Sequence, residues 1–365
     1  MSKKILIYGA GAIGRGYIPW VFSPYEYEYY YVENNDSIHN LLNSKKEFTT
    51  YKTKGDQYEN MKVPVKHCFK NGEEKDFLKE VDVIVTSVGP RNLLSLAENL
   101  HNISTPILCC ENDSFLPKVL STLTNNPNVV FAIPDVITSN VATDEFKKND
   151  PLSIITEDGV CYIDKKVSHV GGDCIYVDEE ELKKQWQAKL YLHNTPHCIA
   201  AYLGSLLGVQ YVHEVMNNKN AQEIVANAMK EMQEVLLKTF NLDEKFVNWY
   251  AEKELKRFSN MLLYDPVTRV AREPFRKLAL GERLIGAAEL ALGSGIIPEN
   301  IIKGIMAAFY YNNPRDPDAN ISYLINALEP TDFLRIAMKL DDKSALHKLI
   351  LDRWSDNIRI LKNLK

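Results

Sequence analysis

Short apolar runs alternate with stretches of helical periodicity along roughly the first half of the chain. The apolar runs end at glycines or polar residues, as strands buried in a parallel sheet do, and they cover residues 4–8, 29–32, 81–86, 106–110 and 129–133. Three shorter β-rich segments follow at residues 152–155, 160–163 and 174–177. Strands that alternate with helices predict an α/β fold with a parallel sheet.

From about residue 179 onward, the apolar positions recur with the period of a helix. We expect helices at residues 179–192, 197–207, 221–240, 243–263, 274–292, 298–311, 322–327, 331–340 and 344–361. A chain of 365 residues is long enough for two domains with separate cores. The change of periodicity therefore predicts an α/β N-terminal domain, residues 1–178, followed by a mostly α-helical domain, residues 179–365.

The first apolar run leads directly into a glycine-rich turn with the spacing of a dinucleotide-binding motif. Gly9 permits a tight turn, Gly11 lets the backbone approach a pyrophosphate, and Gly14 lets the next helix pack against the strand. The second run ends in Glu33, where such a fold needs a carboxylate for the ribose hydroxyls. This context predicts a Rossmann-type domain, and the alternative is a glycine turn that binds no nucleotide.

The residues around Glu33 and at the ends of later strands extend this prediction. Glu33 is followed by Asn-Asn-Asp, with no arginine to receive a 2′-phosphate, which favours NAD over NADP. Ligands of open parallel sheets bind beyond the carboxyl ends of the strands. We therefore expect further cofactor contacts from the glycine turn and from two later strand ends, at Ile13, Gly89, Pro90, Glu111 and Asn112. Ordinary turn chemistry explains each of the later four equally well.

Residues 189–197, KLYLHNTPH, combine a lysine, an amide and an imidazole in one helical stretch. At about 100° per residue, Asn194 and His197 lie about 140° and 80° around the helix axis from Lys189, so one broad face presents all three. Pro196 disfavours helix at the residue before it, so we expect a break and a second helix with Thr195 as its N-cap. The trio is suited to moving a proton on and off an alcohol; the alternative is chance co-occurrence in a helix.

A second group of charges combines three arginines at i, i+3 and i+7 with an adjacent lysine: Arg269, Arg272, Arg276 and Lys277. Pro274 excludes one unbroken helix through them. Guanidinium groups match pairs of phosphate or carboxylate oxygens, which favours an anion site. The alternative is that these cations form ion pairs with neighbouring acids, Glu273 and Glu282 among them.

Composition narrows the class of protein further. The net charge is −5 and no long basic stripe occurs, which argues against a nucleic-acid partner. The six cysteines have no CxxC spacing, and no histidine has metal-ligand spacing, so we expect reduced thiols and no metal. No apolar stretch reaches membrane-spanning length and no signal peptide is evident. We expect a cytoplasmic protein that is a monomer or a small homo-oligomer.

Five motifs together resemble the polyol-specific long-chain dehydrogenases, and within them the mannitol-1-phosphate 5-dehydrogenases. In chain order they are IGRGY at 13–17, TSVGP at 86–90, CEN at 110–112, the Lys189-x4-Asn194-x2-His197 element with AYLG at 201–204, and RKL at 276–278. The resemblance covers nearly the whole chain, and the lysine-asparagine-histidine element is specific to the wider group. It implies a metal-independent enzyme in which Lys189 is the general base and Asn194 and His197 hold the reacting oxygen.

The resemblance also predicts the reaction: NAD-dependent oxidation of a sugar-alcohol phosphate to the ketose phosphate, and the reverse reduction. The candidate phosphate ligands are Arg276, Lys277 and Arg272. Two departures affect the polyol pocket, since PDVITS at 134–139 replaces the family's usual Val-Asp-Arg and Pro196 replaces a small residue. The alternatives are a dehydrogenase of an unphosphorylated polyol or sugar acid, and a catalytically idle NAD-binding regulator, against which the complete catalytic trio argues.

Overall fold

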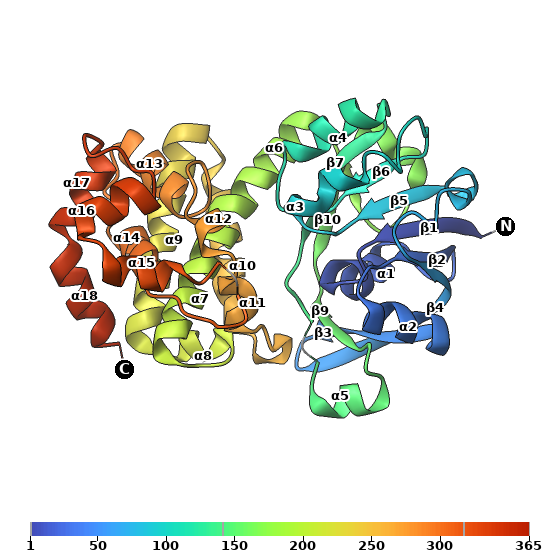
Figure 1. Cartoon of the computed structure of the whole chain (residues 1–365), viewed down its shortest axis with the longest axis horizontal. Coiled ribbons are helices and arrows are strands. Elements are labelled where there is room, and N and C mark those ends of the chain that lie inside the picture. The colour runs from blue at the N-terminus through green and yellow to red at the C-terminus, as the bar shows by residue number, and fades with distance from the viewer. Residues whose placement is uncertain (1, 141, 317, 365) are drawn as a thin grey trace. The chain divides into compact units, whose positions relative to one another are not determined.

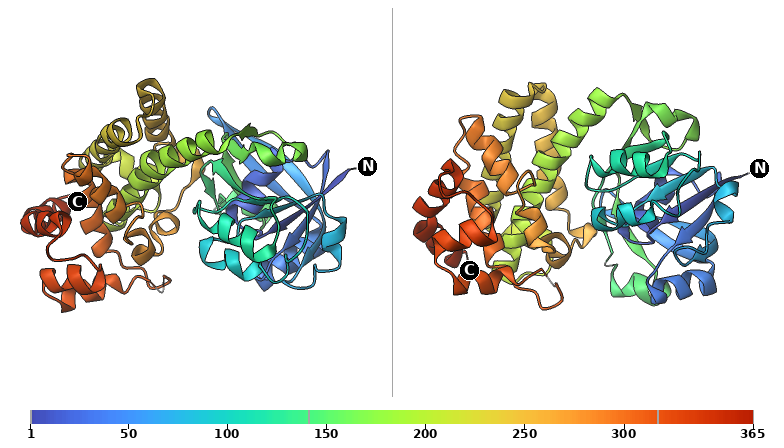
Figure 2. Two further views of the ribbon diagram at one scale, coloured as in Figure 1. Left: turned by 90° about the horizontal axis from the view of Figure 1, so that it is seen from above. Right: turned by 45° about the horizontal axis from the view of Figure 1, so that its top comes forward.

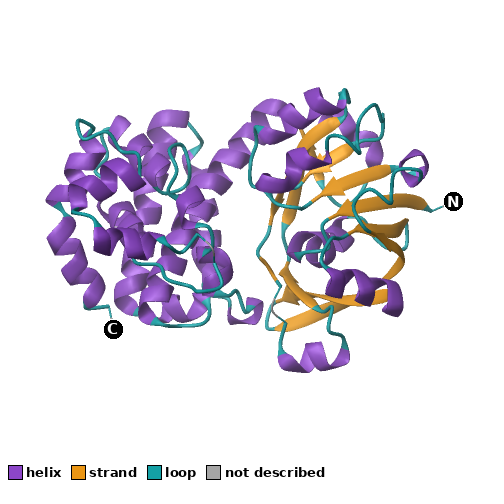
Figure 3. Ribbon diagram, in the orientation of Figure 1, coloured by secondary structure: helices purple, strands orange, loops and turns teal. Residues whose placement is uncertain are grey.

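The computed structural model describes residues 2–140, 142–316 and 318–364, and the chain divides into two compact units (Figure 1). Unit 1 comprises Met1–Trp186 and Leu262–Tyr264, and unit 2 comprises Gln187–Met261 and Asp265–Lys365. Every strand of the described residues belongs to unit 1, whereas the elements of unit 2 are helices (Figure 3). The predicted fold class, an α/β N-terminal part followed by a mostly helical C-terminal part, is confirmed.

Unit 1 is built around one sheet, in which the described residues form eleven strands in the order β11-β10-β7-β6-β5-β1-β2-β4-β3-β9-β8. The six strands from β7 to β4 in this order run parallel, and β10, β3 and β8 pair antiparallel with β7, β4 and β9. The strand bounds are β1 Lys3–Tyr8, β2 Tyr27–Val32, β3 Glu47–Lys54, β4 Gln57–Phe69, β5 Val83–Thr86, β6 Ile107–Cys109, β7 Val129–Asp135, β8 Thr138–Ser139, β9 Ile154–Glu157, β10 Val160–Asp164 and β11 Ile175–Val177.

The register of the parallel strands gathers the predicted cofactor residues at one edge of the sheet. Tyr8, the last residue of β1, pairs with Val32 of β2 and with Thr86 of β5. The segments that follow these three strands therefore leave the sheet at the same edge. That is where open parallel sheets bind their ligands.

Alternating side chains of β1 belong to two separate apolar cores. Ile5 and Ile7 pack into one buried cluster, and Leu6 and Tyr8 pack into another, as the period of a strand requires. The helices of this unit, with η marking 3-10 and π helices, are η1 Ala12–Tyr17, α1 Ile18–Val21, α2 Asp36–Lys45, η2 Phe77–Glu80, α3 Pro90–Leu93, η3 Leu94–Leu96, α4 Leu116–Thr124, α5 Asp144–Asn149 and η4 Lys165–Val170.

The eight predicted strands occur within two residues of their expected bounds, but strands β3, β4 and β8 were not predicted. Strands β3 and β4 form an antiparallel hairpin that turns at Gly55, which has a positive φ of 58°. Their exposed faces carry many polar and charged side chains, which hide the apolar alternation. Only the buried positions, such as Phe48 and Val63, mark the core face.

The other helices of unit 2 surround α7, whose residues from Thr195 to Gly204 are all buried. Figure 2 shows the helices of unit 2 from two further directions. Helix α14 passes close to α7, because a Cβ on Gly304 would lie 2.4 Å from Ile199. The helical stretch that leads into and forms this unit comprises α6 Glu179–Ala188, η5 Lys189–Asn194, α7 Thr195–Leu207, α8 Val212–Asn217, α9 Lys219–Phe240, α10 Glu244–Phe258, η6 Met261–Leu263, α11 Val267–Ala271, α12 Pro274–Lys277, α13 Ile285–Gly293, α14 Glu299–Phe309, α15 Ile321–Ala327, α16 Pro330–Asp332, η7 Phe333–Ala337, α17 Ala345–Asp352 and α18 Trp354–Lys362.

Three predicted helices are interrupted: the one over 344–361 is divided into α17 and α18 at Arg353, and the other two breaks lie beside polar residues of unit 2. The helix expected over 243–263 ends at Phe258, and Pro266 disfavours helix at Asp265. The helix expected over 274–292 is divided into α12 and α13 by a turn in which Gly281 has a φ of 77°. Within the described residues, no helix is long and apolar enough to cross a membrane.

Candidate active site

The glycine turn after β1 is packed so closely that two of its glycines exclude a side chain. Gly9 has a φ of 91°, and a Cβ there would lie 2.6 Å from the carbonyl oxygen of Ser87. A Cβ on Gly14 would lie 2.1 Å from the carbonyl oxygen of Gly9. A Cβ on Gly11 would have no neighbour within 4 Å, so the turn is open at Gly11 alone of the three. This geometry fits a backbone that approaches a dinucleotide at Gly11.

We expect Gly11→Ala and Gly14→Ala to separate cofactor binding from folding. Gly11→Ala adds a methyl group in open space, so the melting temperature without cofactor should stay unchanged while NAD affinity falls about tenfold or more. Gly14→Ala forces a backbone shift and should lower the free energy of unfolding by about 1–3 kcal/mol. Thermal unfolding and calorimetric NAD titration measure both quantities. Wild-type NAD affinity in Gly11→Ala would contradict the assignment.

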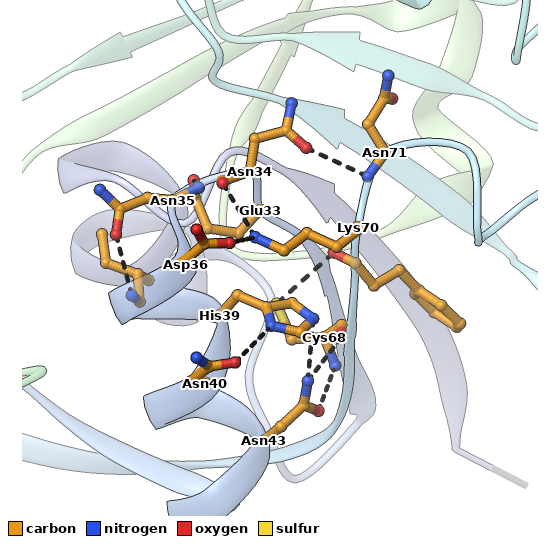
Figure 4. Close-up of polar contacts among 12 residues, drawn as sticks. Glu33, Asn34, Asn35, Asp36, His39, Asn40, Asn43, Cys68, Lys70 and Asn71 are labelled. Carbon is orange, nitrogen blue, oxygen red and sulfur yellow. Dashed lines mark hydrogen bonds and ion pairs between the residues drawn. The ribbon is translucent and has the colours of Figure 1, made fainter.

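Glu33 directs its carboxylate back to the glycine turn. It accepts hydrogen bonds from the backbone N–H of Ala10 at 2.9 Å and of Asn35 at 2.7 Å. A lysine lies beside the residues that follow Glu33 (Figure 4). The Nζ of Lys70 donates to the carbonyl oxygen of Asn34 at 2.9 Å and lies 2.7 Å from Asp36. Lys70 was not predicted from the sequence, because it reaches this place only through the pairing of β4 with β2. No motif next to Glu33 indicated it.

We expect the enzyme to prefer NAD clearly over NADP, because a 2′-phosphate would meet Glu33 and Asp36, and Lys70 is already paired with Asp36. Glu33→Gln should narrow the preference by about tenfold, equivalent to about 1.4 kcal/mol. The matched control is Glu26→Gln, because Glu26 is an exposed carboxylate just before β2. The measurement is kcat/KM with each cofactor, and equal wild-type efficiency with both would refute the assignment.

The predicted residues at the later strand ends have different roles in the structure. Glu111 is buried and accepts from the N–H groups of Val88 at 2.9 Å and Gly89 at 2.8 Å, so it holds the loop between β5 and α3. Burial raises the pKa of Glu111, although these hydrogen bonds oppose the rise. Gly89 has a φ of 86° and precedes α3, which begins at Pro90. Asn112 is exposed and Ile13 is half-buried.

Lys189, Asn194 and His197 lie on one continuous helical stretch, so the predicted break at Pro196 is wrong. Residues 189–194 form a π turn, in which the N–H of Thr195 bonds the carbonyl of Leu190, five residues back. This change of register lets the chain pass Pro196 without ending the helix. Thr195 itself is helical instead of an N-cap, and its hydroxyl donates to the carbonyls of Leu190 and Arg283 at 3.2 and 2.7 Å.

The three predicted catalytic side chains are buried in unit 2, with 6% of Lys189, 8% of Asn194 and 5% of His197 exposed. The Nδ2 of Asn194 has no hydrogen-bond partner among the described residues, and a buried amide donor left unpaired is costly. Such a donor is suited to a substrate oxygen. Within the described part of the chain, no three His, Cys, Asp or Glu side chains gather as a metal site.

His197 is held by a carboxylate from the loop after α10. Its Nε2 lies 2.6 Å from Oδ2 of Asp265, whose other oxygen accepts from the Nε of Arg269 at 3.0 Å. Burial opposes ionisation of Asp265, but the charge of Arg269 and the contact with His197 outweigh it and lower its pKa to about 2. Asp265 therefore stays ionised and fixes the imidazole. Asp265 was not predicted as a partner of His197, because the two residues are 68 positions apart in the chain.

The predicted phosphate ligands are engaged with groups of the chain itself. The Nε of Arg276 donates to Glu273 at 2.8 Å, as the ion-pair alternative predicts, and its Nη1 lies 3.9 Å from Glu282. The buried Nζ of Lys277 donates to the carbonyls of Val270 at 2.5 Å and of Arg272. Burial lowers the pKa of Lys277 to about 7. The Arg272 side chain is exposed.

Arg283, which was not predicted as a site residue, adds a cation beside this group. It is buried, and its Nε donates to Glu282 at 3.1 Å. The Nη2 of Arg283 and the Nη1 of Arg276 are both buried without a hydrogen-bond partner among the described residues. Buried guanidinium nitrogens that lack a hydrogen-bond acceptor are suited to the oxygens of an anion.

Comparison with known proteins identifies the family. Residues 3–187 match the family model described as the mannitol dehydrogenase Rossmann domain, and residues 181–353 match the mannitol dehydrogenase C-terminal domain. The mannitol-1-phosphate 5-dehydrogenase of Thermoanaerobacter pseudethanolicus is 30% identical over 341 residues, which cover 87% of this chain and 88% of that protein. The enzyme of the same name from Clostridium acetobutylicum is 31% identical over 350 residues, covering 87% of this chain and 88% of that protein.

Solved structures show the same fold at low sequence identity. A ternary complex of Pseudomonas fluorescens mannitol 2-dehydrogenase with NAD and D-mannitol has a TM-score of 0.77 and 15% identity, and it covers 100% of this chain and 94% of that one. A substrate-free D-sorbitol dehydrogenase has a TM-score of 0.65 and 13% identity, covering 100% of this chain and 95% of that one. With the two family models and the relatives at 30% identity or more, these findings establish that the chain belongs to the mannitol dehydrogenase family.

Proposed function

We propose that this chain is an NAD-dependent dehydrogenase that oxidises a sugar-alcohol phosphate to the ketose phosphate and catalyses the reverse reduction. The observation that carries the proposal is the buried set of Lys189, Asn194 and His197 on one helical stretch. Relatives named mannitol-1-phosphate 5-dehydrogenase, about 30% identical, support the phosphorylated substrate. The Gly11 turn and Glu33 support NAD as cofactor.

In this proposal Lys189 takes the proton of the reacting hydroxyl. Burial disfavours the charged form of an amine, and a base near neutral pH needs the neutral form. NAD, when bound, supplies the acceptor for the hydride that leaves the carbinol carbon. The carbinol thereby loses one proton and one hydride and becomes a carbonyl.

Asn194 and His197 hold the oxygen from which the proton leaves. The Nδ2 of Asn194 donates to it, and Asp265 fixes the His197 ring through Nε2, so we assign the contact with the oxygen to the other ring nitrogen, Nδ1. Both side chains are buried before substrate arrives, so little reorganisation is needed as negative charge develops on the oxygen. Chelators are expected to leave the activity unchanged, because a lysine takes the proton without a metal.

A second candidate function is the oxidation of an unphosphorylated polyol, and one observation favours it. Arg276 is bonded to Glu273, and the ammonium of Lys277 donates to two backbone carbonyls. Two of the three predicted phosphate ligands thus already have partners within the chain. The replacement of Val-Asp-Arg by residues 134–139 also leaves the choice of polyol open.

The test is NADH formation by the purified enzyme with a panel of hexitol phosphates, free hexitols and sugar acids. The proposal predicts that a hexitol phosphate is turned over fastest, and that the corresponding ketose phosphate supports NADH oxidation. NAD binding without turnover of any polyol would instead indicate the idle regulator. Cytoplasmic location and a monomer or small homo-oligomer stay predictions, which fractionation and light scattering address.

A further inference from the structure

A second histidine-carboxylate-arginine set lies beside the one that holds His197. The Nδ1 of His193 lies 2.5 Å from Oε2 of Glu254, and the Oε1 of Glu254 also accepts from Arg257. The parallel is close, since each imidazole contacts one buried carboxylate and each carboxylate contacts one arginine. His193 is not part of the lysine-asparagine-histidine element, and the proposed reaction gives it no role.

The two sets meet at their imidazole rings. The ring of His193 lies 4.9 Å from that of His197, centroid to centroid, at an angle of 57°. Phe258 contacts both, since its ring stacks on His197 at 5.0 Å and lies 5.6 Å from His193. His197 is thus fixed by three contacts: Asp265 at its Nε2, Phe258 on its face, and His193 beside it.

Helix α10 provides the anchor for this arrangement. Glu254 and Phe258 are four residues apart and therefore lie on the same face of the helix. Glu254 is fully buried, and Lys253, Arg257 and His193 are among its charged or titratable neighbours. A buried carboxylate that accepts a hydrogen bond from an imidazole fixes the tautomer and the orientation of the ring. An apolar side chain at position 193 would form no such hydrogen bond with Glu254.

We propose that His193 is a positioning residue, which Glu254 orients so that its ring holds the ring of His197 in place for the substrate oxygen. The proposal rests on the proposed function, because it assigns His193 a part in the same site. A misplacement of a catalytic group by about 1 Å costs on the order of 10²-fold in rate. Loss of the His193 contact should therefore appear in kcat.

The experiment compares two variants of His193 with the wild type. His193→Leu removes both the ring contact and the donor to Glu254, whereas His193→Asn keeps a donor near the position of Nδ1 but lacks the ring. We expect both to lower kcat about 10- to 100-fold with NAD affinity unchanged. The melting temperature should fall in His193→Leu and recover in His193→Asn. Wild-type kcat in His193→Asn would show that His193 serves only as a hydrogen-bond donor to the buried Glu254, and this result would overturn the proposal.

A double-mutant cycle tests whether the effect passes through His197. In a His197→Asn background there is no imidazole left to position, so adding His193→Leu should lower kcat no further. Equal losses in both backgrounds would contradict the proposal. Glu254→Gln should resemble His193→Leu, while Glu252→Gln, an exposed carboxylate on the same helix, is the control that should retain wild-type kcat.

A spectroscopic readout keeps this proposal separate from the proposed function. The nitrogen-15 signals of the His197 ring in selectively labelled protein report its environment without turnover. Glu254→Gln should shift these signals and Glu252→Gln should not. If no polyol is oxidised but the shift occurs, the proposed function fails and the positioning of His197 stands. Unchanged His197 signals in Glu254→Gln would overturn the positioning proposal even where the enzyme is active.

Discussion

Lys189→Ala is expected to lower turnover on the order of 10²–10⁴-fold, the usual size of a general-base contribution, while NAD affinity stays largely intact. Lys189 is buried at the start of the π turn, and the proposal assigns it the hydroxyl proton. An alanine there leaves Asn194 and His197 to hold the oxygen but supplies no group to accept the proton. The measurement is kcat for polyol oxidation together with a calorimetric NAD titration.

The matched control for this prediction is Lys183→Ala. Lys183 is an exposed lysine on α6, in the same continuous helical stretch, so its loss changes charge and helix propensity without touching the buried trio. We expect wild-type kcat from it. Retention of wild-type turnover in Lys189→Ala would refute the general-base assignment, and so would inactivation by removal of a stoichiometric metal.

The features that were predicted from the sequence are those whose physical causes are local. Apolar runs predict the strand bounds, and the glycine turn comes directly after β1. Each of these features is therefore recognised from a continuous segment of about twenty residues or fewer. The hairpin of β3 and β4 was missed because its exposed face is polar. Lys70 was missed because it reaches Asn34 and Asp36 only through the pairing of β4 with β2.

The helical unit shows the same limit at its buried polar residues. The lysine-asparagine-histidine element is local and was found, but Asp265 lies 68 residues from His197, which it contacts, and Glu254 lies 61 residues from the neighbouring His193. Helical periodicity alone extended α10 through 263 and so concealed the loop that carries Asp265. The π turn was also not predicted, because Pro196 indicates a break and the shifted hydrogen-bond register depends on packing around α7.

The group of Arg269, Arg272, Arg276 and Lys277 shows that the spacing of charges predicts their proximity but not the partner of each residue. Spacing predicts that the arginines lie close together, and both readings, anion binding and ion pairing, use the same charges. The structure places Arg276 against Glu273 and Glu282, and it buries the ammonium of Lys277 against backbone carbonyls. The nitrogens available for hydrogen bonds to a phosphate are Nη1 of Arg276 and Nη2 of Arg283, which are buried and have no hydrogen-bond partner among the described residues.

The enzyme is expected to act far better on a hexitol phosphate than on the free hexitol. A substrate phosphate would accept hydrogen bonds from the buried Nη1 of Arg276 and Nη2 of Arg283, whereas a free hexitol offers these two nitrogens no charged hydrogen-bond acceptor. Hydrogen bonds to charged groups contribute about 1.5–3 kcal/mol each, so kcat/KM should differ by about 10²-fold or more. The comparison uses mannitol 1-phosphate, sorbitol 6-phosphate and free mannitol.

Arg276→Ala should remove most of this preference by lowering kcat/KM for the phosphorylated substrates while leaving the weak activity on free mannitol nearly unchanged. Arg335→Ala is the matched control, because Arg335 forms the same i, i+3 ion pair with Asp332 on an exposed surface. Lost selectivity in Arg276→Ala and retained selectivity in Arg335→Ala would assign the phosphate to Arg276. Equal use of free and phosphorylated polyols by the wild type, or an unchanged preference in Arg276→Ala, would favour the unphosphorylated polyol as substrate.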